Sequence, residues 1–159
     1  MRVAATPQPT DFYVAGGTLR ADAPSYTGGL AHTQALDELA AEGTHFPPLT
    51  VSGSWTVPSL TAIATGTFPH RVGICRWRHR FPLRRPTLMS AFAAAGFEVR
   101  TVVHNPRFCL ANTGQRGIVG DSEVPEQVVE ALRTPPGADR FVVIHHWWTH
   151  LPYVQEKLV

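Results

Sequence analysis

The sequence predicts a single α/β domain in which helices cover both faces of a mostly parallel sheet. The chain has 159 residues, which is the length of one domain with a substantial buried core. Segments with strand patterns alternate along it with segments of helical spacing, an order typical of layered α/β folds. Residues 141–144 (FVVI) are apolar throughout, as expected of a parallel strand that is covered on both faces.

Three strands are expected from the pattern of apolar residues, over 12–15, 97–103 and 141–144. In 97–103, apolar and β-branched residues alternate with charged ones, which is typical of a strand with one buried face. Ligands of parallel sheets sit beyond the carboxyl ends of the strands. The segments of interest are therefore 16–30, 104–112 and 145–153, together with 52–60, which opens a helix.

Four helices are expected, over 33–42, from 56–59 to 66, over 87–95 and over 122–133. Gly43, Gly66 and Gly96 supply stop signals for the first three. Ser122 is a suitable N-cap for the fourth. Pro58 suits a first helical turn, where its missing N–H has no cost.

Composition narrows the class of protein. The chain has 14 Lys and Arg residues and 12 Asp and Glu residues, a net charge of +2 that is too small to indicate a nucleic-acid partner. No apolar run approaches the roughly 18 residues of a membrane helix, and the N-terminus lacks the apolar stretch of a secretory signal. Cys75 and Cys109 are too few for a disulfide framework. We therefore expect a cytoplasmic protein with reduced cysteines, no membrane partner, and residues 1–10 as a flexible leader.

The segment 54–59 (SWTVPS) is the first candidate site. It places hydroxyls and backbone N–H groups at a helix N-terminus, where the N–H groups and the helix dipole both favour a sulfate or phosphate anion. A hydroxyl at this place could attack such an ester if a metal or a base lowered its pKa. The alternative is that these Ser and Thr residues only cap the helix.

Two further segments carry reactive or charged side chains. Residues 145–150 (HHWWTH) follow the third strand, and their histidines suggest either zinc ligands or structural hydrogen bonds. His146 and His150 would share a face only in a helix, which a segment between a strand and Pro152 does not favour. Residues 76–85 interleave basic and aromatic side chains, as in a polyanion-binding loop or an ordinary solvated loop.

Six segments, in order, resemble blocks of the sulfatase family, within the alkaline-phosphatase-like superfamily. They are TLRAD at 18–22, residues 32–46, WTVPS at 55–59 with 65–74, TL at 87–88 with 95–97, NP at 105–106, and residues 141–153. The third block resembles the nucleophile segment "WTLPSHASLLTGLYPHRHGV" of the family. The resemblance implies an alkaline-phosphatase-like fold, with residues 11–159 as the N-terminal portion of a sulfatase-like catalytic domain.

The resemblance also implies a chemistry. The family hydrolyses sulfate esters, and its relatives hydrolyse phosphate esters and phosphonates, beside a divalent cation (Ca²⁺, Mg²⁺, Mn²⁺ or Zn²⁺). By position, Thr56 would be the nucleophile and His150 would contact the substrate. True sulfatases use a modified Cys or Ser, so a plain threonine hydroxyl favours phosphoester chemistry. The expected partner is a small-molecule or polymer ester of sulfate or phosphate.

The chain departs from the family pattern at the positions where metal ligands are expected. Gly17 stands where the first metal-binding Asp is expected, and the later metal motif of the family would lie beyond Val159. A divalent ion needs several oxygen ligands, so we assign no metal ligand here. We expect a hydrolase by ancestry that is inactive or incomplete as this chain, with a missing C-terminal half as a partner. The alternatives are a degenerate, non-catalytic binding module and a weak polyanion or nucleic-acid binder through residues 76–85.

Overall fold

The computed structural model describes residues 10–46, 49–76, 79, 85–103, 129, 139–146 and 149. Their elements run in the order β1 (Thr10–Gly16), η1 (Ser25–Thr27), α1 (Gln34–Glu42), α2 (Thr56–Thr65), η2 (Pro69–Val72), α3 (Leu88–Ala94), β2 (Glu98–Val103) and β3 (Arg140–His146). The domain is α/β, as predicted. None of the described helices is long and apolar enough to cross a membrane.

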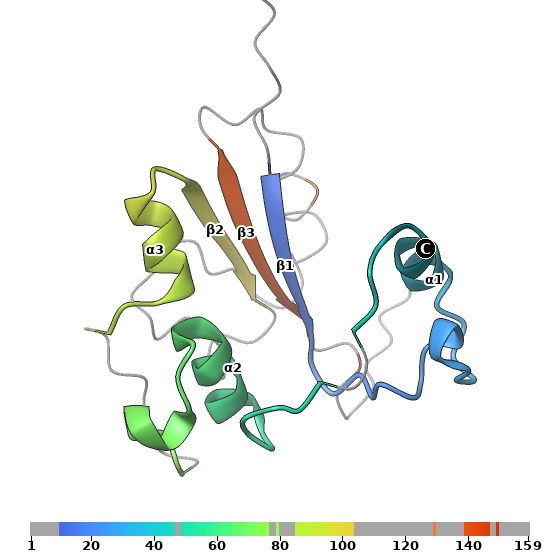
Figure 1. Cartoon of the computed structure of the whole chain (residues 1–159), viewed down its shortest axis with the longest axis horizontal. Helices are drawn as coiled ribbons and strands as arrows, with labels where there is room; N and C mark the ends of the chain where they lie inside the picture. The colour runs from blue at the N-terminus through green and yellow to red at the C-terminus, as the bar shows by residue number, and fades with distance from the viewer. Residues whose placement is uncertain are drawn as a thin grey trace, which may run out of the picture.

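The three strands form a parallel sheet in the order β1-β3-β2. The first residues of the strands, Thr10, Glu98 and Arg140, are aligned, so all three carboxyl ends lie at one edge of the sheet (Figure 1). The central strand β3 is the apolar run expected to be covered on both faces. Each of its residues from 141 to 144 is at most 8% exposed, which confirms that expectation.

Two helices cover one face of the sheet. Leu60 and Ala64 of α2 and Met89 of α3 form a buried cluster with Phe141 and Val143 of β3. Figure 1 shows α2 and α3 together on one side of the sheet, with α2 at the end to which the strands point. The packing of this face therefore places α2 at the edge of the sheet where ligands are expected.

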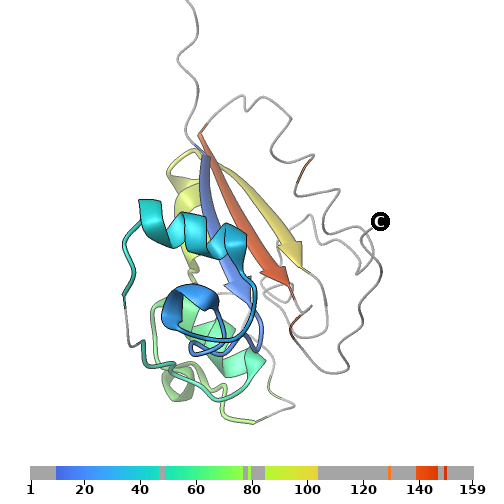
Figure 2. The same ribbon diagram turned by 90° about the vertical axis from the view of Figure 1, so that its right-hand side faces the viewer.

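The second face of the sheet is also buried at its centre. Val102, Val142 and Ile144 form a separate apolar cluster there. The described helix on that side, α1, has no buried residue and has its main contacts with η1 (Figures 1 and 2). The helix predicted over 122–133 lies outside the described residues except for Val129. Within the described residues, then, helical cover is established for the face of α2 and α3.

The helix ends follow the signals in the sequence. The predicted stops Gly66 and Gly96 both have a positive φ, of 60° and 91°, which a glycine adopts without strain. At the start of α3, the Thr87 hydroxyl accepts a hydrogen bond from the Ser90 amide (3.1 Å), and the Ser90 hydroxyl accepts one from the Thr87 amide (2.7 Å). This capping box fixes the entry to α3.

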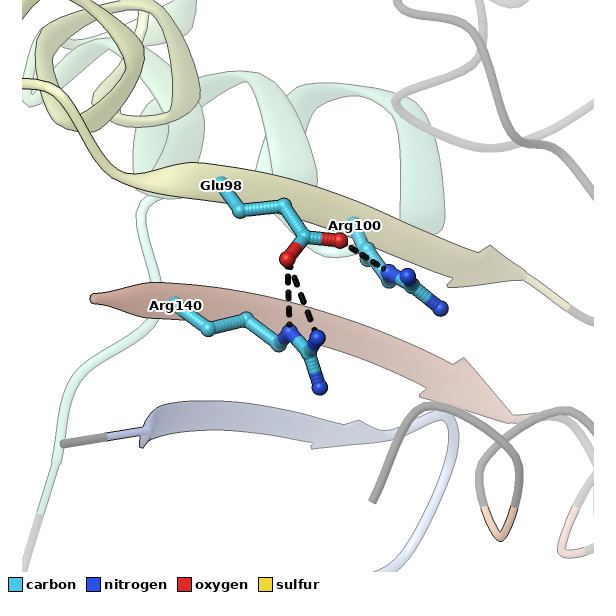
Figure 3. Close-up of polar contacts among 3 residues, drawn as sticks. All are labelled: Glu98, Arg100 and Arg140. Carbon is cyan, nitrogen blue, oxygen red and sulfur yellow. Dashed lines mark hydrogen bonds and ion pairs between the residues drawn. The ribbon is translucent and has the colours of Figure 1, made fainter. Parts of the chain in front are cut away.

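A charged cluster joins β2 to β3 at their amino ends. Glu98 accepts hydrogen bonds from Nε and Nη2 of Arg140 (3.1 and 3.0 Å) and from Nε of Arg100 (2.6 Å; Figure 3). Arg140 is 1% exposed, so its charge requires a partner. Burial raises the pKa of Glu98, but the hydrogen bonds from both arginines outweigh burial and hold that pKa below its ordinary value of 4.5.

Glu98→Gln should lower the free energy of unfolding by about 1–3 kcal/mol, because the carboxylate that accepts two hydrogen bonds from the buried Arg140 guanidinium is lost. Glu42→Gln, at the exposed end of α1, is the matched control and should change that free energy by less than about 0.5 kcal/mol. Urea unfolding at neutral pH measures both. Equal effects of the two substitutions would show that the cluster is worth no more than a surface charge.

The free energies of unfolding of wild type and Glu98→Gln should respond differently to acid. Since the pKa of Glu98 is lowered by folding, its contribution is complete above about pH 4.5 and is lost as the pH falls through the folded value. The difference in unfolding free energy between wild type and Glu98→Gln should therefore shrink below about pH 4.5. Urea titrations at several acidic pH values measure it, and a difference that stays constant with pH would contradict the assignment.

Candidate functional site

The N-terminus of α2 has no side-chain cap. Its N-cap residue, Trp55, is extended, and the first bond of the helix runs from the Ser59 amide to the Trp55 carbonyl (3.2 Å). The amides of Thr56 and Val57 donate to none of the described residues. Pro58 has no amide hydrogen, so these two N–H groups are the free donors of the first turn. They lie at the positive end of the helix dipole.

The hydroxyls of this segment do not cap the helix either. Thr56 is half-buried, and its hydroxyl makes no hydrogen bond with a described residue. Ser54 is exposed and likewise gives the helix no cap. The alternative that these residues only cap α2 is therefore wrong. The cause is local: the helix begins at Thr56 itself, one residue too early for Thr56 to be the N-cap, and that position falls to Trp55, which has no hydroxyl.

A depression of about 430 Å³ adjoins this first turn. It is lined by Val51, Ser52, Gly53, Ser54, Trp55, Pro58, Pro69, His70, Ile74 and Cys75. A side chain on Gly53 would place its Cβ 2.8 Å from Cβ of Pro58 and 2.9 Å from the amide nitrogen of Ser59. Gly53 thus lets residues 51–55 pass directly over the start of α2, a role that sequence analysis missed because a glycine in a loop gives no sign of what it approaches.

The ends of β1 and β3 meet at the same edge of the sheet. The Thr18 hydroxyl contacts the carbonyl oxygens of Gly17 (2.7 Å) and Thr149 (2.6 Å), and the Thr149 hydroxyl donates to the Gly17 carbonyl. This contact brings the loop after β1 to the segment after β3, as the prediction for a parallel sheet requires. The predicted substrate-contacting residue, His150, follows Thr149 in the sequence and lies outside the described residues.

The structure changes the interpretation of the histidine segment. Strand β3 continues through His146, so His145 and His146 belong to the strand and not to the loop after it. His145 is 2% exposed.

Of the basic segment 76–85, the structure describes only residues 76, 79 and 85. Cys75, expected to be a reduced residue, is free and exposed at the rim of the depression, and the predicted loop 104–112 lies outside the described residues.

The described residues do not fit the divalent cation that the family resemblance implies. No group of three or more His, Cys, Asp or Glu side chains comes together among them. Position 17 is a glycine. The Asp22 carboxylate, in the same motif, is held by Arg20 (2.8 and 2.5 Å), whose hydrogen bond lowers the pKa of Asp22. Asp37 accepts from the Ser25 hydroxyl (2.6 Å), which lowers its pKa in the same way.

The chain matches a known family of proteins. A family model described as Sulfatase matches residues 9–158, and the chain therefore belongs to the sulfatase family. A search of curated proteins finds no match. The fold is alkaline-phosphatase-like, as predicted, and solved structures with this fold superpose on it.

Three solved structures show the likeness. The C-terminal periplasmic domain of EcEptC from Escherichia coli, in complex with Zn, matches 94% of this chain with a TM-score of 0.68 and 18% identity. BT4656, in complex with its substrate D-glucosamine-2-N,6-O-disulfate, matches 87% with a TM-score of 0.72 and 16% identity. An alkaline phosphatase superfamily protein from Vibrio parahaemolyticus matches 95% with a TM-score of 0.69 and 17% identity. The chain spans 46%, 34% and 43% of these structures, less than half of each.

Thr56→Val should leave the free energy of unfolding within about 0.5 kcal/mol of wild type, because the hydroxyl that it removes has no described partner. Thr87→Val is the matched control, since the same change at the capping box of α3 should cost about 1 kcal/mol. Urea unfolding of both variants compares the two threonines. If Thr56→Val lowers the free energy of unfolding more than Thr87→Val does, the Thr56 hydroxyl has a structural role.

Proposed function

We propose that this chain binds the sulfate or phosphate group of an ester at the N-terminus of α2, with Thr56 in contact with that group. The observation that carries the proposal is the uncapped first turn. The amides of Thr56 and Val57 and the hydroxyl of Thr56 are three donors without described partners, at the positive end of a helix of 10 residues. A tetrahedral oxyanion offers acceptors to all three at once.

Family membership supports the class of ligand. The sulfatase family relates this chain to hydrolases of sulfate and phosphate esters. One structural relative, BT4656, is in complex with a disulfated glucosamine. We extend this class of ligand to the present chain as a small-molecule or polymer ester. By resemblance, His150 contacts the same anion from the segment after β3.

The described residues support binding of the ester better than its hydrolysis. A threonine hydroxyl becomes a nucleophile only when a base or a cation lowers its pKa. Among the described residues, no carboxylate or imidazole is hydrogen-bonded to Thr56, and no cluster of acidic or histidine side chains fits a cation. Our proposal is therefore a binding domain of the sulfatase family in which Thr56 keeps the place of the nucleophile.

Sulfate and inorganic phosphate should each raise the melting temperature of the wild-type protein, by an amount that grows with the logarithm of anion concentration above Kd. Thr56→Val should reduce that rise, because one of three donors is lost. Thr44→Val, at an exposed threonine after α1, is the matched control and should keep it. Chloride at equal ionic strength controls for salt. An equal rise in all three proteins would remove Thr56 from the site.

Turnover separates binding from hydrolysis. With p-nitrophenyl phosphate and p-nitrophenyl sulfate, the wild-type chain should release no more nitrophenol than Thr56→Val, with or without added Mg²⁺, Ca²⁺, Mn²⁺ or Zn²⁺. Cation-dependent release by wild type that disappears in Thr56→Val would overturn the binding proposal. It would show that residues beyond those described complete a hydrolase.

A further inference from the structure

The carboxyl end of β1 is where the family resemblance places the first metal ligand, and the residues found there hold one another instead. We propose that a threonine clasp, made of Gly17, Thr18 and Thr149, joins the ends of β1 and β3 without a divalent cation. Thr149 is then the positioning residue for the segment that carries His150. This inference rests on the proposed function only for the role of His150.

The clasp continues the sheet beyond its last paired residues. The pairing of β1 with β3 ends at Gly16 and His146. Past this point, the Thr18 hydroxyl reaches the Thr149 carbonyl (2.6 Å) and the Gly17 carbonyl (2.7 Å), and the Thr149 hydroxyl donates to Gly17. Two chain segments more than a hundred residues apart in sequence are therefore tied where the backbone ladder no longer holds them.

The hydroxyls and carbonyls of the clasp hydrogen-bond to one another. Thr149 donates its hydroxyl hydrogen to the Gly17 carbonyl, and Thr18 has one hydroxyl hydrogen for the Gly17 and Thr149 carbonyls. No carboxylate takes part, and the nearest acidic residue of the motif, Asp22, is neutralised by Arg20. A divalent cation is held by anionic and carbonyl oxygens with free lone pairs. The clasp has no anionic group to offer one, and the Gly17 carbonyl oxygen already accepts from the Thr149 hydroxyl.

The backbone at Thr18 also indicates that the clasp is held firmly. Thr18 has a φ of 60°, the one described residue other than glycine with a positive φ. This left-handed conformation is unfavourable for a β-branched residue and persists only where the surroundings enforce it. The contact of the Thr18 hydroxyl with the Thr149 carbonyl is one interaction that accompanies this conformation.

The first test is the melting temperature of wild type, Thr149→Val and Thr149→Ser, each with EDTA and with added Mg²⁺, Ca²⁺, Mn²⁺ or Zn²⁺. Wild type should melt at the same temperature in all media. Thr149→Val should melt lower by about 2–4 °C, the effect of one lost hydrogen bond in a domain of this size, and Thr149→Ser should recover most of that loss. Failure of Thr149→Val to fold while Thr149→Ser folds would equally support the hydroxyl. A cation-dependent rise in wild type, or a Thr149→Val that melts like wild type, would overturn the clasp.

The second test asks whether Thr149 positions His150. Sulfate Kd, measured by calorimetry, should rise about 2–10-fold in Thr149→Val and recover in Thr149→Ser, whereas Thr44→Val should leave it unchanged. The double variant Thr149→Val/His150→Ala should bind no more weakly than His150→Ala alone, because the two act through one contact. Additive losses would overturn the positioning role. If Thr56→Val loses sulfate binding and Thr149→Val keeps wild-type affinity, the positioning role of Thr149 is refuted and the proposed function stands. If Thr56→Val binds sulfate as wild type does, the proposed function is refuted. The melting test then still decides whether the clasp exists.

Discussion

The burial of β3 between β1 and β2 is the constraint on which the rest of the structure depends. Its backbone is paired on both sides, and its side chains are buried on both faces of the sheet. An interior strand of this kind must be apolar, yet it begins at Arg140, a residue with 1% exposure. The Glu98 carboxylate helps to compensate that burial by accepting two hydrogen bonds from the guanidinium. The same pair aligns the first residues of β2 and β3, and register at one end of a parallel sheet sets where the other end falls.

The site at the opposite edge follows from this alignment. Because the strands are parallel, the turn after β1 and the segment after β3 leave the sheet side by side, and threonine hydroxyls connect them. The cluster of Leu60, Ala64 and Met89 against β3 fixes α2 on the adjoining face. Packing in the core, rather than any contact at the site itself, therefore delivers the open first turn of α2 to the ligand-binding edge.

Much of this arrangement could be predicted from the sequence. The helix ends at Gly66 and Gly96 were predicted because these glycines carry local signals that do not depend on tertiary contacts, whereas Thr87, predicted as the first helical residue, is the N-cap of α3. The run 141–144 identified the central strand, although its true end at His146 was missed since a histidine at a strand end has no apolar pattern. The roles that the structure gives Gly53, Thr18 and Thr149 could not be predicted from the sequence, because each acts through a neighbour that only the fold supplies. Whether a hydroxyl caps a helix depends on a single residue of register, which explains the wrong alternative for the segment 54–59.

The cation centre that the family resemblance implies and the anion-binding first turn that we propose for α2 have different structural requirements. A cation centre requires several oxygen ligands in one place, and Gly17 provides no carboxylate at the position where the family resemblance implies one. A helix N-terminus requires only a helix, since its donors are backbone groups that no substitution other than proline removes. An anion-binding first turn can therefore remain after a metal centre has gone, as long as the core still holds α2 in place. In this chain the buried cluster that holds α2 includes Phe141 and Val143 of β3, so the proposed anion site depends on the stability of that strand.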